Sequence, residues 1–257
     1  MWIQKIPEFR SGHILKQEMM TELTAYLYHL GPLLYQNCTD GIISGCALTT
    51  TANSIVVNPG VIRYENELYL LREPQSIHYT PTNTTRVLHI IFRDQIQTDS
   101  FVSREMELAF TDGDSFEKNH LELCRFKLQP GAHLRYLYTS FADRETEYDT
   151  LNTIHTPFCG MDRPTLSPEI TAHFAREALA SGADGMDALF CMMLLSSKEP
   201  IQAEALETYI LSKQGPEFLC GDNLCLYQGL IACLKQFKGG KHLAAASKRK
   251  SWSIMMD

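Results

Sequence analysis

The stretch that decides the fold is residues 40–71, DGIISGCALTTTANSIVVNPGVIRYENELYLL. Its apolar runs are short and are separated by turn residues, which is the pattern of strands joined by tight turns. The β-branched residues 55–57 are stiff at χ1 and suit a pleated surface. Asn58-Pro59-Gly60 ends this strand, because proline has no ladder donor and glycine permits a positive φ. Glu65-Asn66-Glu67 is the tip of the next hairpin, so the stretch predicts short strands in succession.

The strand pattern continues to residue 137. Residues 85–93 are apolar on both faces, which indicates a central strand, and residues 106–110 and 121–128 alternate in character. We expect residues 94–103 to form a loop and residues 134–137 to form a last short strand. Many short strands with regularly spaced turns predict an antiparallel β-sandwich or open barrel. The structural turns are assigned to Gly41, Gly45, Pro59, Gly60, Pro130 and Gly131.

An arm and a helix precede these strands. Residues 1–10 are predicted to be extended, with apolar anchors for a partner surface at Trp2, Ile3, Ile6 and Phe9. A helix is predicted over residues 11–30, and Gly31-Pro32 is expected to end it. Its apolar stripe packs within the chain in the favoured interpretation and against another subunit in the alternative. The stripe consists of Leu15, Met19, Leu23, Tyr26, Leu27 and Leu30.

After the acidic segment 143–149, the period of the apolar residues changes from two to about 3.6. Ser167-Pro168-Glu169 begins a helix with an N-cap residue, a proline at the first position and an acid in the first turn. Residues 188–195, ALFCMMLL, are apolar nearly all round, so we expect a buried helix. The predicted fold class is α+β. Its parts are an N-terminal arm and helix over 1–36, an antiparallel β-sandwich over 37–142, a helical bundle over 143–240 and a C-terminal arm over 241–257.

The composition is that of an ordinary globular protein, with 44% hydrophobic and 21% charged residues. The net charge of −7 argues against non-specific binding to nucleic acid, which depends on Lys and Arg. No apolar run approaches the about 18 residues of a membrane span, and the charged N-terminus does not resemble a signal peptide. The eight cysteines form no C-x-x-C pair and are predicted to be reduced thiols that pack as small hydrophobes.

No pattern of residues predicts catalysis, a cofactor or a bound metal ion. Asp112 and Asp114 favour a hairpin turn over a calcium loop, because the other ligand positions are absent. His155 and Cys159 are separated by Pro157, so their spacing does not place them on one helical face for zinc. The chain has no nucleophile elbow, P-loop or Rossmann glycine pattern. The sequence therefore favours a structural or adaptor protein over an enzyme.

Four short motifs resemble the N-terminal modules of bacteriophage tail-fibre and baseplate proteins. They are DGIISGC from Asp40, VVNPG from Val56, IRYENELYL from Ile62 and LELCRFKLQPGA from Leu121. The resemblance covers roughly residues 11–137, and the helical part is similar to the C-terminal half of proteins from Firmicute prophage tail loci. It implies a structural role for Gly41, Gly45, Pro59, Gly60, Tyr64, Tyr69, Pro130 and Gly131.

The resemblance implies a structural component of a phage tail or contractile injection system. Such a protein is made in the bacterial cytoplasm and is built in several copies into a virion or injection particle, where it contacts other tail or baseplate proteins. The chain ends in a small helical bundle instead of a fibre shaft or receptor-binding head, so we expect an adaptor between baseplate and tail fibre. The candidate interface residues are Trp2, Ile3, Phe9, Tyr64 and Tyr69.

Two other functions stay open. One is a carbohydrate-binding module for receptor recognition, in which exposed tyrosines such as Tyr64 and Tyr69 stack on sugars. The other is a DNA-binding regulator with a helix-turn-helix over residues 186–211. The second helix of that motif carries Glu204 and Glu207 and no arginine, which is unfavourable for contacts to bases or phosphates.

Overall fold

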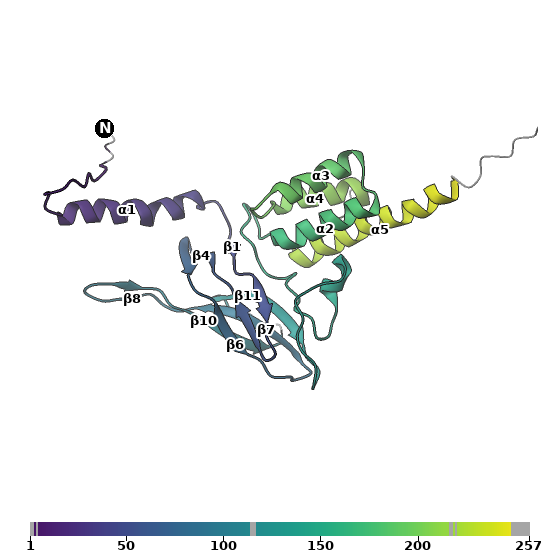
Figure 1. The fold of residues 1–257 in the computed structure, drawn as a ribbon, viewed down its shortest axis with the longest axis horizontal. Coiled ribbons are helices and arrows are strands. Elements are labelled where there is room, and N and C mark those ends of the chain that lie inside the picture. Colours follow the sequence, from purple (N-terminus) through teal and green to yellow (C-terminus); the bar gives the residue numbers. More distant parts are fainter. Residues whose placement is uncertain (1–2, 4, 114–116, 216–217, 219, 248–257) are drawn as a thin grey trace, which may run out of the picture.

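The chain has an α+β fold in which antiparallel sheets lie below an N-terminal helix and a C-terminal group of helices (Figure 1). The computed structural model describes residues 3, 5–113, 117–215, 218 and 220–247. Trp2, one of the candidate interface residues, lies outside the described residues. The fold class predicted from the sequence is confirmed, and the sheets are open and not closed into a barrel.

Three three-stranded sheets and one hairpin make up the β region, and their named strands all pair antiparallel. The first sheet has the order β1 (Gly41–Gly45), β4 (Gly60–Tyr64), β5 (Glu67–Leu71). The second has the order β2 (Leu48–Thr50), β3 (Ser54–Val57), β6 (Gln75–His78). The third has the order β10 (Met106–Asp112), β7 (Thr85–Phe92), β11 (His120–Lys127). The hairpin consists of β8 (Ile96–Gln97) and β9 (Val102–Ser103).

One buried apolar cluster holds these sheets together. Each sheet contributes side chains to it, and β7 is the central strand of its sheet, as its two apolar faces predict. At the tip of the β4–β5 hairpin, Glu65 and Asn66 have φ values of 47° and 66°, which a two-residue turn of type I′ requires. The cluster includes Ile42, Ile55, Val57, Ile62, Leu88, Ile90, Leu121 and Leu123.

Two expectations for the β region are wrong. Residues 94–103 were expected to form a plain loop, but they contain the β8–β9 hairpin. Residues 134–137 were expected to form a strand, but they make only an isolated bridge between Arg135 and Thr150. Two hydrogen bonds hold Arg135 in place there. Its guanidinium donates to the carboxylate of Asp143, and its backbone N–H donates to the carbonyl oxygen of Asp149.

Two of the predicted turn residues, Gly45 and Gly60, lie where the backbones of β1 and β4 come close together. Gly45 has a φ of 71°, and a Cβ atom there would collide with the carbonyl oxygen of Pro59. A Cβ atom on Gly60 would lie 2.7 Å from the oxygen of Ser44. Only glycine allows the two backbones to come so close. Pro130 and Gly131 form the turn after β11, in open space.

The N-terminal helix α1 (Gln17–Leu34) begins and ends later than predicted. Its N-cap is Lys16, whose side chain makes no capping bond, so Ser11 does not start the helix. The helix continues through Gly31 and Pro32 to Leu34. Gly31 faces β5, where a Cβ atom would lie 2.5 Å from Cδ1 of Leu68. The glycine therefore permits a close contact between helix and sheet instead of ending the helix.

The second half of the chain contains the 3₁₀ helix η1 (Phe141–Glu145) and the helices α2 (Pro168–Ser181), α3 (Gly185–Ser196), α4 (Ala203–Gln214) and α5 (Asn223–Ser247). The predicted start of α2 is confirmed, because the side chain of Ser167 accepts a bond from the backbone N–H of Ile170. Gly182 ends α2 in the left-handed conformation. A second buried cluster, which includes Phe174, Leu194, Leu206 and Leu230, holds these helices together.

The expectation that α3 is buried is wrong. Only Asp187, Cys191 and Leu194 of this helix are buried, and Met186 is 79% exposed. Helix α3 packs mainly on α2, and the described part of the chain covers only one of its faces. An apolar pattern all round a helix predicts full burial only when another element of the chain reaches its second face.

Candidate interaction surface

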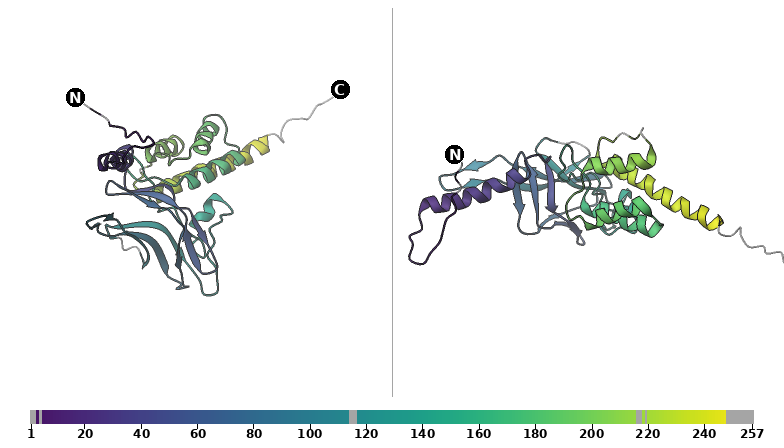
Figure 2. Two further views of the ribbon diagram at one scale, coloured as in Figure 1. Left: turned by 60° about the vertical axis from the view of Figure 1, so that its left-hand side comes forward. Right: turned by 90° about the horizontal axis from the view of Figure 1, so that it is seen from above.

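Helix α1 lies at the end of the molecule away from α2–α5 (Figure 2). Its contacts with the other helices and strands are mainly with β5. Large apolar side chains on it are nevertheless exposed to solvent, including Tyr26 at 55%, Leu33 at 60% and Leu34 at 68%. Isolated apolar residues on a surface are ordinary, but a contiguous set marks an interaction site.

These side chains form one stripe along the helix, which we call the apolar arc. At 3.6 residues per turn, its members cover about 140° of the helix circumference. The arc contains no ionisable side chain except the tyrosine hydroxyl of Tyr26. Its described members are Met19, Met20, Leu23, Tyr26, Leu30, Leu33 and Leu34. The predicted stripe shares Met19, Leu23, Tyr26 and Leu30 with this arc; Leu15 lies before the helix, and the side chain of Leu27 lies outside the described part of the structure. Leu23, Tyr26 and Leu30 are exposed, so the favoured interpretation, in which the stripe packs within the chain, is wrong for them.

The N-terminal arm runs back along α1. Lys5 Nζ lies 2.7 Å from Glu18 Oε1, which ties the arm to the first turn of the helix. Ile3 and Phe9, two of the candidate interface residues, are 66% and 57% exposed. Between arm and helix lies a groove of about 850 Å³, whose lining includes Ile3, Ile6, Leu23, Tyr26, Leu30 and Leu33 and also Lys5, Glu22 and His29. Arm and arc together therefore offer a largely apolar surface with ionisable groups at Lys5, Glu22 and His29.

The structure places Tyr64 and Tyr69 on the neighbouring strands β4 and β5 of the first sheet. The ring of Tyr64 stacks on Phe92 with centroids 4.0 Å apart, and Tyr69 meets Phe92 edge to face at 4.9 Å. Partial burial raises the pKa of both hydroxyls above the ordinary value. The two tyrosines therefore form a single aromatic cluster with Phe92, which the sequence spacing alone did not reveal.

A second exposed apolar surface lies on α3. We call it the α3 face and define it by Met186, Leu189, Met192 and Met193, which are between 42% and 79% exposed. Methionine is flexible and polarisable, so such a face adapts to the shape of a partner. The sequence predicts a buried helix over residues 188–195, which includes Leu189, Met192 and Met193 but not Met186. The signal that could have identified the face is the run of methionines, since cores usually favour better-defined shapes.

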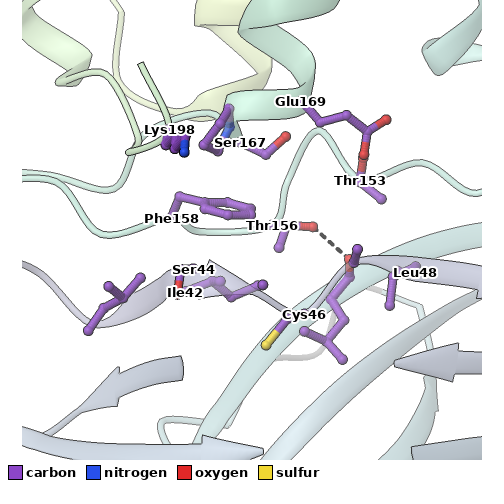
Figure 3. A pocket seen from close by; sticks show the side chains of 15 residues that line it. Ile42, Ser44, Cys46, Leu48, Thr153, Thr156, Phe158, Ser167, Glu169 and Lys198 are labelled. Atoms are coloured by element: carbon purple, nitrogen blue, oxygen red, sulfur yellow. Dashed lines mark hydrogen bonds between the residues drawn. The ribbon is translucent and has the colours of Figure 1, made fainter. Parts of the chain in front are cut away.

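A small pocket of about 230 Å³ lies where β1 meets the start of α2 (Figure 3). Its polar groups already serve the fold: Thr156 Oγ1 donates to the carbonyl oxygen of Leu123 at 2.6 Å, and Ser167 caps α2. Glu169 pairs with Arg144 at 2.8 Å. Burial raises the pKa of the Cys46 thiol to about 11, which keeps it protonated and unreactive. The arrangement offers no activated nucleophile among the described residues that line it.

Other kinds of site are also missing from the described residues. They contain no group of three or more His, Cys, Asp or Glu side chains that could hold a metal ion. Within the same residues, no helix has the length and apolar character needed to cross a bilayer. The described cysteines form no disulfide with one another. The exposed apolar side chains on α1 and α3 are two candidate partner surfaces among the described residues.

No protein-family model matches the sequence, and no curated protein matches it. Among solved structures, the chain is similar to a crystal structure of TssK, with 11% identity and a TM-score of 0.36 over 91% of this chain and 69% of that chain. It is also similar to a chain of the type VI secretion system TssK-TssF-TssG baseplate subcomplex, with 9% identity and a TM-score of 0.39 over 90% and 99% of the two chains. A chain of the baseplate complex from the type VI secretion system gives 9% identity and a TM-score of 0.34 over 92% and 100%.

Proposed function

We propose that this chain is a structural subunit of the baseplate of a phage tail or contractile injection system. In this proposal it is made in the bacterial cytoplasm and built into the particle, where it acts as an adaptor between baseplate and tail fibre. The observation that carries the proposal is the apolar arc of α1, which is exposed together with the arm beside it. An exposed apolar surface of this kind marks a site at which a partner binds.

The motifs that resemble tail-fibre and baseplate proteins support the same function. They lie on β1, on β3 and β4, on the β4–β5 hairpin and on β11, together with the turns that follow β3 and β11, so they belong to the sheet framework and its turns. Gly45 and Gly60, which the resemblance treats as structural, stand at the closest approach of β1 and β4. The resemblance therefore concerns the residues that shape this framework.

An adaptor must hold two partners at once. The apolar arc and the α3 face belong to separate helices, and α1 lies to the left of the group of helices that contains α3 (Figure 1), so in the proposal two different proteins occupy them. In the proposal, one surface binds the baseplate and the other binds the fibre. In the proposal, the body of the chain, which is held together by its two buried clusters, connects these two surfaces.

Purified particles from cells that carry the gene test this function. We expect mass spectrometry to detect the chain as a stoichiometric component, and antibody labelling in electron microscopy to place it at the baseplate. Particles from cells with Leu189→Glu should retain the chain and lose the component attached at the α3 face. Lys198→Glu, on an exposed residue next to α3 and outside that face, is the matched control. A chain that never copurifies with particles would contradict the proposal.

A carbohydrate-binding module is the second candidate function, and one observation favours it. The Tyr64 and Tyr69 cluster borders a pocket of about 410 Å³ whose polar residues include Arg104 and Asn119. Aromatic rings beside planar polar groups suit a sugar ring. Saturation-transfer NMR with maltotriose and chitotriose separates the two functions, because a structural subunit shows no transfer to either probe.

A further inference from the structure

We propose that Cys220 and Cys225 form a dithiol site, which closes to an intramolecular disulfide when the chain meets a small disulfide such as oxidised glutathione. The site lies at the start of α5, and it is independent of the proposed function. The reasons are the contact between the two thiols, the hydrogen bonds that hold each cysteine, and the difference in their exposure to solvent.

The two thiols lie together at the first turn of α5. Cys225 belongs to that turn, and the side chain of a helical residue leans toward the N-terminus of its helix. Sγ of Cys220 lies on that side, 3.6 Å from the carbonyl oxygen of Asp222, the residue directly before the helix. The side chains of Cys220 and Cys225 form a hydrogen bond with each other. The folded chain therefore brings the two sulfur atoms close together before any oxidation.

Hydrogen bonds to the backbone hold both cysteines in these places. The N–H of Cys220 donates to Oε1 of Glu207 on α4 at 3.3 Å, and its carbonyl oxygen accepts from Nη1 of Arg163. Arg163 also pairs with Glu207, so the two groups that hold Cys220 support each other. The N–H of Cys225 donates to Oδ1 of Asp222 at 2.8 Å. The contact between the thiols is thus part of the hydrogen-bonded framework that joins α4 to α5.

The segment between the cysteines leaves room for the bond to form. A disulfide requires the sulfur atoms to come within about 2.05 Å of each other. Gly221 is exposed, and a Cβ atom there would meet no other atom within 4 Å. The backbone at Gly221 therefore lies in open space and can adjust without a clash, while Glu207 and Asp222 keep their hydrogen bonds to the two cysteines.

The exposure of the two thiols sets the order of the reaction. Cys225 is half-buried and Cys220 is 9% exposed, so a small disulfide meets Cys225 first. The Cys225 thiolate attacks one sulfur of the reagent, which forms a mixed disulfide and releases one reagent thiol. Cys220 gives its proton to water, and its sulfur then displaces the second reagent thiol from Cys225. Two protein thiols are oxidised to one disulfide, and one reagent disulfide is reduced to two thiols.

Burial, together with the neighbouring Cys225 thiol, raises the pKa of the Cys220 thiol. The thiolate is the reactive form, so closure of the bond by Cys220 is the slower of the two steps. Two other cysteines differ in their position. Cys124 and Cys191 are fully buried, so a reagent in solvent does not reach them. Cys38 is half-buried, as Cys225 is, and provides the matched control.

Peptide mapping of the full chain tests the inference. The folded protein is incubated with oxidised glutathione, quenched in acid, unfolded, alkylated with N-ethylmaleimide and cut with an endoproteinase that cleaves before aspartate. Cleavage before Asp222 places Cys220 and Cys225 on different peptides, so mass spectrometry detects their disulfide as a linked pair. We expect this pair in the unchanged chain, with alkylation of both cysteines reduced at least about 10-fold. Dithiothreitol should restore the alkylation.

Three variants make the test specific. Cys225→Ser should give no linked pair, and Cys220→Ser should stop at the mixed disulfide of Cys225 with glutathione. Cys38→Ser should form the linked pair as the unchanged chain does. Far-UV circular dichroism shows whether each variant is folded, and the result for the unchanged chain decides the inference even where a variant is not.

An unchanged chain whose Cys220 and Cys225 stay fully alkylated after oxidation overturns the inference. A disulfide from either residue to Cys233, located by fragmentation of the linked peptides, overturns it as well. A chain that forms the Cys220–Cys225 bond and is absent from particles contradicts only the proposed function. A chain that is found in particles and never forms the bond contradicts only the dithiol site.

Discussion

At the scale of single residues, Asp143 shows how one carboxylate orders a connecting segment. It accepts bonds from Nη1 and Nη2 of Arg135 at 2.5 and 2.6 Å. It also accepts from the backbone and hydroxyl of Thr139 and from the hydroxyl of Thr146. The Arg135 guanidinium and these donors hold the pKa of Asp143 well below its usual range. The acidic segment 143–149 is thus anchored to the sheet framework at its first residue.

We expect Asp143→Asn to lower the free energy of unfolding by roughly 2 kcal/mol at neutral pH, because it removes a charge-assisted pair. A carboxylate with a lowered pKa stabilises the fold above the unfolded value of about 3.9 and loses that contribution as the pH falls. The difference between parent and variant should therefore shrink below about pH 4. Urea unfolding followed by circular dichroism at pH 7 and in acid measures it.

The control for Asp143→Asn is Glu147→Gln. Glu147 pairs with Lys127 at 2.9 Å, but its side chain is 67% exposed. An exposed pair contributes about 0–1 kcal/mol, so this variant should unfold almost as the parent does. Equal losses for the two variants would mean that Asp143 has no special place in the fold.

At the scale of elements, α1 and α3 show the limit of apolar patterns. Both helices have more apolar residues than can fit on one buried face. The apolar side chains that are not on the buried face are exposed to solvent in both helices. The pattern of α3 suggested a fully buried helix, and the stripe of α1 suggested packing within the chain. In the structure, α2 covers one face of α3, and β5 touches α1 near Gly31.

We expect substitutions on the two faces of α3 to differ sharply in their effect on stability. Leu194→Ala, at a residue that is 1% exposed, should lower the free energy of unfolding by roughly 3 kcal/mol, because it leaves a cavity. Leu189→Ser, at a residue that is 60% exposed, should change it by about 0.5 kcal/mol or less. Urea unfolding of the two variants makes the comparison. A large loss for Leu189→Ser would mean that another part of the chain covers the α3 face.

At the scale of the whole molecule, a buried polar junction joins the sheets to the helices. Arg144, only 2% exposed, donates to Glu169 at 2.8 Å and lies over the ring of Tyr138, with 4.0 Å between the guanidinium carbon and the ring centre. Asn223 donates to the backbone oxygens of Thr156 and Thr165. The proposed boundary after residue 142 therefore falls within a packed connection, and the two buried clusters are expected to unfold together.

We expect Arg144→Ala to separate the unfolding of the two clusters. Loss of this buried side chain should lower the free energy of unfolding by roughly 3 kcal/mol, and calorimetry should show two transitions where the parent shows one. Arg93→Ala is the matched control, because Arg93 pairs with Glu107 on the surface and both side chains are more than half exposed. A variant that still unfolds in one transition at the parent's temperature would contradict a junction at Arg144.

The sequence by itself determined the features that depend on local chemistry. The strands around residues 40–71, the hairpin tip at Glu65 and Asn66 and the cap of α2 at Ser167 follow from the φ preferences, β-branching and capping bonds of the residues themselves. The apolar arm with Ile3 and Phe9 was also visible as a candidate contact region. These features need no knowledge of distant parts of the chain.

Only the tertiary structure decided which apolar residues are covered. It brought Tyr64 and Tyr69 against Phe92, extended α1 past Pro32 and left the α3 face in solvent. Burial is a property of pairs of elements, and the partner of an apolar stripe is set by the path of the whole chain. The spacing of apolar residues therefore predicts that a stripe packs against some other element. The fold decides whether that element belongs to the same chain.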